Sequence, residues 1–163
     1  MWPYLTDDIQ RKLFAAAEES APNEAVGYLE GGIESLDQTC LLFEGLVHLV
    51  NRAPDPTANF VLESDQIRCL REAREAGRFL SLWHSHPHGT PILSKEDRLV
   101  MSVLRIPMLV VSLPLKVMVM FTYLAPSPTS IHQPIVEWGR WKQTDLAELK
   151  EEPRGRQHDL SIA

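Results

Sequence analysis

The sequence has few cysteines and a deficit of positive charge. Only two of its 163 residues are cysteine, Cys40 and Cys69. They lack the close spacing of a metal-binding pair, so we expect reduced, buried thiols, as in a cytosolic protein. The chain has 16 Lys and Arg against 22 Asp and Glu, which gives a formal net charge of −6. This balance argues against a nucleic-acid-binding surface, because phosphate contacts need clustered Lys and Arg.

No apolar run of the sequence is long enough, without interruption, to suggest a membrane span. Residues 106–124 are mostly apolar, but Pro107, Pro114 and Lys116 interrupt them. Two buried strands joined by a turn explain this stretch better, so we expect no membrane association. Residues 1–8 have no positive region followed by an apolar stretch, which predicts no signal peptide and a cytoplasmic protein.

The length and composition of the chain predict one domain. With 163 residues, 44% of them apolar, the chain is long enough for one proper core and too short for two ordinary domains. We assign residues 1–150 to the domain and the charged residues 151–163 to a flexible C-terminal tail.

The pattern of apolar residues predicts helices between groups of strands. Thr6, Ser64 and Ser94 are the expected helix N-caps, and Gly77 is an expected helix stop. This order predicts an α+β fold in which helices flank a mixed β-sheet or β-sandwich. The expected helices are 6–20, 64–76 and 94–104, and the expected strands are 23–31 with a turn at Gly31-Gly32, 39–50 with a break near Glu44-Gly45, 60–62, 78–83, 108–112 and 116–124, followed by a last strand or short helix around Trp138 and Trp141.

His84, Ser85 and His86 have the spacing of a metal-ligand pair. The apolar run before them predicts a strand that carries them at its end. Alternate residues of an extended segment point to the same side, so both histidines share one face and Ser85 faces away. Pro87 prevents this segment from continuing as a central strand.

A carboxylate further along the chain completes the ligand set. Ser94 is expected to cap a helix whose first turn holds Asp97, so Asp97 projects toward the loop that precedes the helix. Two imidazoles and one carboxylate give three ligands and leave the fourth zinc position open for water, as catalytic sites require. A zinc ion at such a site makes hydroxide available at neutral pH.

A site of this kind also needs a base, and Glu24 is the best candidate. Glu24 lies at the head of an apolar run that predicts a buried strand. His88 is in the same loop as the ligands, but a fourth protein ligand would fill the open position, so we interpret it as a loop or substrate-facing residue. His48, His132 and His158 have no partner spacing and receive no role.

Each of these elements also has an ordinary interpretation. A His-x-His pair can be two surface histidines, and a Ser-x-x-Asp spacing alone is a capping box. Glu24 alone could be a solvated residue in a turn. The order of base, ligand pair, hydroxyl and third ligand in one chain favours the metal site over these alternatives.

The motifs together resemble the JAMM (MPN+) metalloprotease family, in its compact prokaryotic or phage type. The resemblance covers roughly the first three quarters of the chain and rests on Glu24 with Gly27 three residues later, the His-Ser-His-Pro element and the Ser-x-x-Asp spacing. It implies a cytidine-deaminase-like MPN fold. By this resemblance His84, His86 and Asp97 bind one Zn²⁺ per chain, Glu24 is the general acid/base, and Ser94 stabilises the oxyanion.

Three further positions bear on the resemblance. Asn51 and Phe60 lie where family members often have an Asn and an apolar strand residue. Val26 departs from the family pattern, because many relatives place a Cys before the Gly, and this departure concerns packing rather than catalysis.

Members of this family cleave peptide or isopeptide bonds after the C-terminal glycine of ubiquitin-like proteins. The resemblance therefore implies a hydrolase that deconjugates or processes a ubiquitin-like or sulfur-carrier protein, for example in a bacterial antiphage conjugation system. The attack is expected to be direct, by water activated at the zinc, without an acyl-enzyme. The C-terminal tail of the substrate would add a strand beside the site.

Two other functions and one assembly question stay open. Residues 84–98 also resemble phage tail-assembly peptidases, and a third hypothesis is a non-catalytic MPN binding scaffold with structural zinc. The presence of Glu24 weighs against the scaffold, because a structural site needs no base. Relatives commonly pair through helices, so Leu99, Val103 and Leu104 could serve a homodimer, although we expect each of them in the core.

Overall fold

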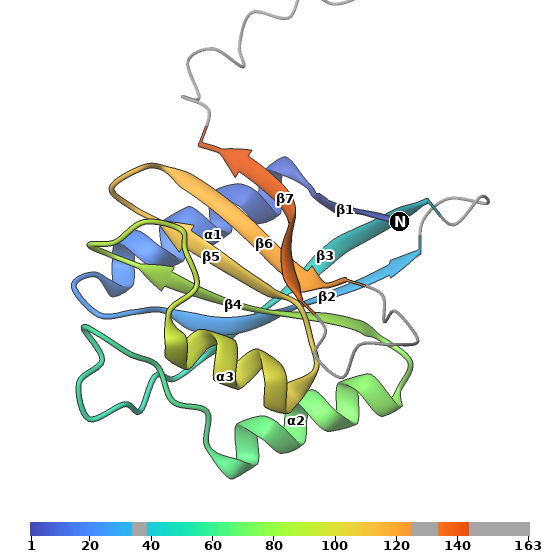
Figure 1. The fold of residues 1–163 in the computed structure, drawn as a ribbon, viewed down its shortest axis with the longest axis horizontal. Helices are drawn as coiled ribbons and strands as arrows, with labels where there is room; N and C mark the ends of the chain where they lie inside the picture. The colour runs from blue at the N-terminus through green and yellow to red at the C-terminus, as the bar shows by residue number, and fades with distance from the viewer. Residues whose placement is uncertain (34–38, 125–133, 144–163) are drawn as a thin grey trace, which may run out of the picture.

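A seven-stranded mixed sheet, in the order β1-β3-β2-β4-β5-β6-β7, forms the centre of the protein (Figure 1). The structure is a computed structural model that describes residues 1–33, 39–124 and 134–143. The predicted α+β class with a mixed sheet is confirmed, and the tail 151–163 lies outside the described residues. The strands are β1 (Trp2–Leu5), β2 (Val26–Ile33), β3 (Cys40–Leu49), β4 (Phe79–His86), β5 (Met108–Ser112), β6 (Val117–Tyr123) and β7 (Ile135–Lys142), and the helices are α1 (Asp7–Ser20), α2 (Ser64–Glu75) and α3 (Lys95–Leu104).

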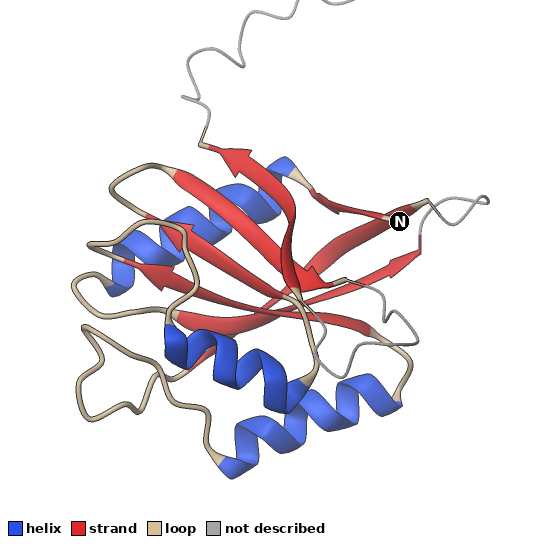
Figure 2. Cartoon of the chain, in the orientation of Figure 1, coloured by secondary structure: helices blue, strands red, loops and turns tan. Residues whose placement is uncertain are grey.

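The helices cover both faces of the sheet. Figure 2 shows α1 on one side and α2 with α3 on the other. Successive strand residues point to opposite faces, so each central strand supplies both cores. Leu29 and Trp83 pack in the core beneath α1, whereas their neighbours Tyr28 and Leu82 pack in the core beneath α2 and α3. The central strands are therefore apolar on both sides, as the continuous apolar runs of the sequence predict.

Most predicted helix ends are confirmed. The Thr6 hydroxyl accepts from the backbone N–H of Ile9 at 3.2 Å and caps α1. Gly77 follows α2 with a positive φ of 81°, as a helix stop requires. The prediction that Ser64 caps α2 is wrong, because the N-cap is Glu63, whose N–H donates to the side chain of Gln66 at 2.9 Å.

Two strand predictions are wrong. The expected turn at Gly31-Gly32 does not form, because β2 continues to Ile33. The expected irregularity of β3 near Glu44-Gly45 is confirmed, since Glu30 pairs with Gly45 and Gly31 with Phe43, which leaves Glu44 as the extra residue of a bulge. The expected extended segment 60–62 is not a regular strand.

The N-terminal strand was not predicted. β1 pairs in parallel with β3, and Pro3 lies beside Leu41 in the ladder. The indole N–H of Trp138 on β7 donates to the Met1 carbonyl at 3.1 Å. The two edge strands of the sheet therefore approach each other, so the sheet curls toward closure. Trp138 lies on a strand, which settles the choice left open for the C-terminal element.

Several burial predictions are also wrong. Cys69 is exposed on α2 and Cys40 is only half-buried on β3. Leu99 and Val103 are 64% and 71% exposed on α3, so they do not belong to the core. Leu104 is partly buried and packs against the core beneath α2 and α3. Homodimer formation through these side chains stays a prediction. Among the described residues, no helix combines the length and the apolar character that crossing a membrane requires.

Trp83 and Gly27 fix the register of the three strands nearest the site. Gly27 pairs with His48 on β3 and with Trp83 on β4. The fully buried Trp83 indole lies over Gly27 and donates its N–H to the Val47 carbonyl at 3.3 Å. A Cβ on residue 27 would lie 2.0 Å from that carbonyl oxygen and 2.5 Å from the indole nitrogen. Glycine is therefore the residue that lets the indole cross β2.

We predict that Gly27→Ala lowers the free energy of unfolding by about 1–3 kcal/mol, because the added methyl overpacks this contact. The measurement is the free energy of unfolding from urea denaturation. Gly32→Ala is the matched control, since it lies in the same strand and its added methyl would meet no atom within 4 Å. Equal losses in the two variants would contradict the role of Gly27.

Candidate metal centre

The two histidines are at the C-terminal end of β4. His84 and His86 pair with Val110 and Ser112 of β5, and Pro87 follows directly after the strand. The prediction that Ser85 faces away from them is confirmed by its contacts, since its Oγ accepts from the N–H of Ala25 at 2.8 Å. Ser85 also donates its own N–H to the Ala25 carbonyl at 3.0 Å. These two bonds join the ligand strand to the residue that follows Glu24.

The predicted capping box at the start of α3 is confirmed. The Ser94 Oγ accepts from the Asp97 N–H at 3.0 Å, and the Asp97 Oδ2 accepts from the Ser94 N–H at 2.7 Å. The second bond turns the Asp97 carboxylate back from the helix toward the loop and the end of β4. Asp97 is buried there, with 4% of its surface exposed.

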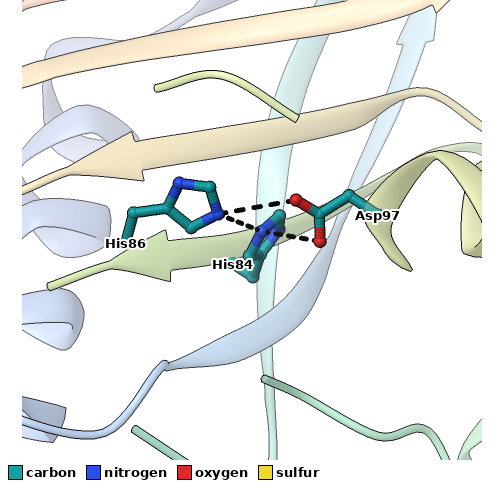
Figure 3. Close-up of side chains that lie close together, drawn as sticks. All are labelled: His84, His86 and Asp97. Carbon is teal, nitrogen blue, oxygen red and sulfur yellow. Dashed lines mark hydrogen bonds and ion pairs between the residues drawn. The ribbon is translucent and has the colours of Figure 1, made fainter. Parts of the chain in front are cut away.

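Three donor atoms converge where β4 and α3 meet (Figure 3). The Nε2 atoms of His84 and His86 are 3.0 Å apart. The Asp97 carboxylate lies 3.1 Å from the Nε2 of His84 and 3.5 Å from the Nε2 of His86. Ligand atoms about 2.0–2.1 Å from a tetrahedral zinc lie roughly 3.3–3.4 Å from one another. The three separations span this value, so the residues fit a zinc ion.

The surroundings of the two imidazoles suit both rings to bind a metal. Its Nδ1 lies 2.7 Å from the Thr90 carbonyl, which can only accept, so Nδ1 carries the proton and the neutral ring has its lone pair on Nε2. Burial lowers the pKa of His84, which favours a neutral ring. The Nδ1 of His84 is buried without a hydrogen-bond partner among the described residues.

Asp97 is the charged member of the set. Burial alone would raise the pKa of Asp97, but the neighbouring imidazoles of His84 and His86 outweigh this and hold the pKa well below its usual range. Burial of His86 opposes its protonation, yet Asp97 and the Thr90 carbonyl raise its pKa. The centre therefore combines an ionised carboxylate with two imidazoles, which is a common donor set of catalytic zinc.

Glu24 lies two residues before β2 and lines a pocket that His86 and Asp97 also line. Its backbone N–H donates to the Pro56 carbonyl at 2.7 Å, and its own carbonyl accepts from the Asn51 amide at 2.9 Å. Burial is the main cause that raises the pKa of Glu24 to about 7, with a contribution from the Asp97 charge against the opposing charge of His86. A carboxyl group with such a pKa can both take and return a proton near neutral pH.

The candidate site opens into a pocket of about 240 Å³. Glu24, His86, Ser94 and Asp97 all line it, so the structure brings the predicted base and hydroxyl to the ligands. Exposed His88 lines the same pocket, and its substrate-facing role stays a prediction. Residues 57–60 also line the pocket, and the centroid of the Phe60 ring lies 4.7 Å from that of the His84 ring.

Asn51 connects two walls of the site, a role that sequence reasoning missed. Its amide donates to the carbonyls of Glu24 and Asn59, both at 2.9 Å. The resemblance pointed to this position without giving it a function. His48 stands apart, against the Trp83 ring, and His132 and His158 lie outside the described residues.

A mixed sheet flanked by helices, with a His-x-His pair at one strand end and an aspartate in the first turn of the next helix, defines a JAB/MPN-type domain with a possible metal site. The family described as prokaryotic homologs of the JAB domain matches residues 6–125. The chain therefore belongs to this family, and the JAMM/MPN resemblance is confirmed.

Solved structures agree with this assignment. A protein from Desulfitobacterium hafniense is 28% identical, with a TM-score of 0.53, over 74% of this chain and 83% of that chain. A protein from Salinibacter ruber is 23% identical, with a TM-score of 0.52, over 82% of this chain and 88% of that chain, and it supports the fold alone. No curated protein matches the sequence.

We predict that Asp97→Asn weakens zinc binding by at least about 100-fold, because a neutral amide replaces a charged ligand while an acceptor for the helix cap is kept. The measurement is zinc per chain by elemental analysis after dialysis against a chelator. Glu96→Gln, the same chemical change one residue earlier in the helix, should leave zinc content unchanged. Full metallation of Asp97→Asn would refute its role as a ligand.

Proposed function

We propose that the protein is a zinc-dependent peptidase or isopeptidase that cleaves after the C-terminal glycine of a ubiquitin-like or sulfur-carrier protein. The observation that carries this proposal is the cluster of His84, His86 and Asp97 at a pocket that His86, Asp97 and the buried Glu24 all line. Three ligands with an open position suit a catalytic metal, but they do not supply a base. A buried carboxyl group with a pKa of about 7 beside them suits proton transfer.

His84, His86 and Asp97 would hold the zinc. When bound, the metal would lower the pKa of water and polarise the scissile carbonyl. Glu24 would take the proton of the attacking water and return it to the leaving amine. No side chain is used as a nucleophile, so no acyl-enzyme forms.

The hydroxyl of Ser94 is available to stabilise the oxyanion. Its oxygen accepts the cap bond from Asp97, and this uses a lone pair rather than the hydroxyl proton. Ser94 lines the pocket, so the proton can point to the substrate carbonyl. A donor of this kind contributes by matching the charge that develops in the transition state.

The lining of the pocket is compatible with a tail that ends in glycine. Phe60 and residues 57–59 line the pocket together with His88 and Gly89. A glycine tail would bring its carbonyl into this pocket without a side chain to accommodate. The phage tail-assembly function and the cytoplasmic location stay predictions, and so does the antiphage context.

The proposal is tested with ubiquitin-like proteins that end in Gly-Gly and are fused to a reporter. We expect cleavage directly after the second glycine, loss of cleavage on chelation and recovery on addition of zinc. One zinc per chain without cleavage of any such fusion would refute the substrate class. Absence of zinc from the protein would refute the metal centre.

We predict that Glu24→Gln keeps its zinc and loses about 10²- to 10⁴-fold in turnover, because the change removes the proton acceptor and leaves the ligands in place. The measurements are zinc content and kcat on the cleaved fusion. Glu19→Gln, at an exposed position near the end of α1, should retain wild-type turnover. Wild-type turnover in Glu24→Gln would remove Glu24 from the mechanism.

A further inference from the structure

Ser112 is a fully buried serine behind the candidate metal centre. It is the last residue of β5 and pairs with His86 across the parallel ladder. Its Oγ donates to the Gly89 carbonyl at 2.6 Å and accepts from the Leu115 N–H at 3.4 Å. The proposed mechanism does not use this hydroxyl, although it is bonded to a loop of the site.

The loop that Ser112 contacts also holds His86. The chain leaves β4 at Pro87, and residue 90 returns its carbonyl to the Nδ1 of His86 at 2.7 Å. Gly89, whose carbonyl Ser112 binds, is the residue directly before Thr90. The two hydrogen bonds therefore fix consecutive carbonyl groups, one to the end of β5 and one to the ligand ring.

Little else in the described structure holds this part of the loop. Residues 88–90 are exposed, so they bury little apolar surface. Gly89 has no side chain, and a Cβ placed there would only come within ordinary contact distance of His86, at 3.6 Å from its Cβ. Hydrogen bonds thus carry more of the loop's order than packing does.

We propose that Ser112 is a positioning residue for the metal centre. By holding the Gly89 carbonyl, it keeps the Thr90 carbonyl against the Nδ1 of His86. That bond keeps the ring proton on Nδ1 and presents the lone pair of Nε2 toward His84 and Asp97. The inference deepens the proposed function and rests on it for the identity of the metal.

We expect the loss of Ser112 to weaken zinc binding less than the loss of a group that contacts a ligand directly. Groups that orient a metal-bound histidine typically contribute about 10–100-fold to metal affinity. Ser112 acts through one further peptide group, so Ser112→Ala should raise the zinc dissociation constant by about 10-fold or somewhat less.

The experiment compares Ser112→Ala with Ser81→Ala. Ser81 is also fully buried, and its hydroxyl also donates to a backbone carbonyl, that of Leu82 at 3.0 Å, but it bonds to no loop of the site. Zinc affinity is measured by competition with a chromophoric chelator. The tautomer of His86 in the zinc-free protein is measured by ¹⁵N NMR of the imidazole rings.

We expect the neutral His86 ring to keep its proton on Nδ1 in both the wild type and Ser81→Ala. These two proteins should also bind zinc with the same affinity. Ser112→Ala should give a mixture of tautomers and weaker binding. If Ser112→Ala does not fold, Ser112→Cys, which keeps nearly the same volume and has a weaker donor, should give the same direction of change. An unchanged tautomer and affinity in the variant that folds would overturn the inference.

The two proposals can fail separately. Zinc binding by the wild type with no effect of Ser112→Ala would leave the metal centre in place and remove Ser112 from it. A wild type that binds no zinc would refute the proposed function. The His86 tautomer of the zinc-free protein would then still decide whether Ser112 positions the ring.

Discussion

The passage of the Trp83 indole over Gly27 is the contact on which the rest of the site depends. It fixes the pairing of β2 with β4, because no other residue at position 27 would leave room for the ring. Trp83 directly precedes His84, and Gly27 follows Glu24 by three residues. The same contact that fills the core therefore sets the position of Glu24, the proposed base, relative to His84, a proposed ligand. Ser85 also holds β4 against the start of β2, through its two hydrogen bonds to Ala25.

The other half of the site depends on the start of a helix. Asp97 completes the capping box of α3, and the bond from the Ser94 N–H aims its carboxylate toward the histidines. A negative side chain is also favoured in the first turn of a helix, where the macrodipole is positive. The ordinary and the functional interpretations of Ser-x-x-Asp are thus not alternatives in this chain. The cap positions the carboxylate of Asp97, the proposed third ligand.

Local features of the site could be predicted from the sequence, and those set by distant contacts could not. The common face of His84 and His86 follows from strand periodicity, and the Ser94 cap from neighbouring residues. The N-cap of α2 at Glu63 could not be predicted, because Gln66, whose side chain accepts from the Glu63 N–H, is itself held by the Val50 carbonyl at 2.9 Å. The bridge made by Asn51 depends in the same way on two segments that only the fold brings together, and so does the pairing of β1.

Burial acts on both carboxyl groups of the candidate site. The fold encloses two carboxyl groups, of which Asp97 is ionised and Glu24 has a pKa of about 7 because it is withdrawn from water. A buried charge is costly unless an opposite charge or a metal compensates it. A divalent cation among His84, His86 and Asp97 would balance both carboxylates and favour the ionised form of Glu24, which is the form that accepts a proton. A site that only bound a metal would need no base, so the second buried carboxyl group is the feature that argues for catalysis.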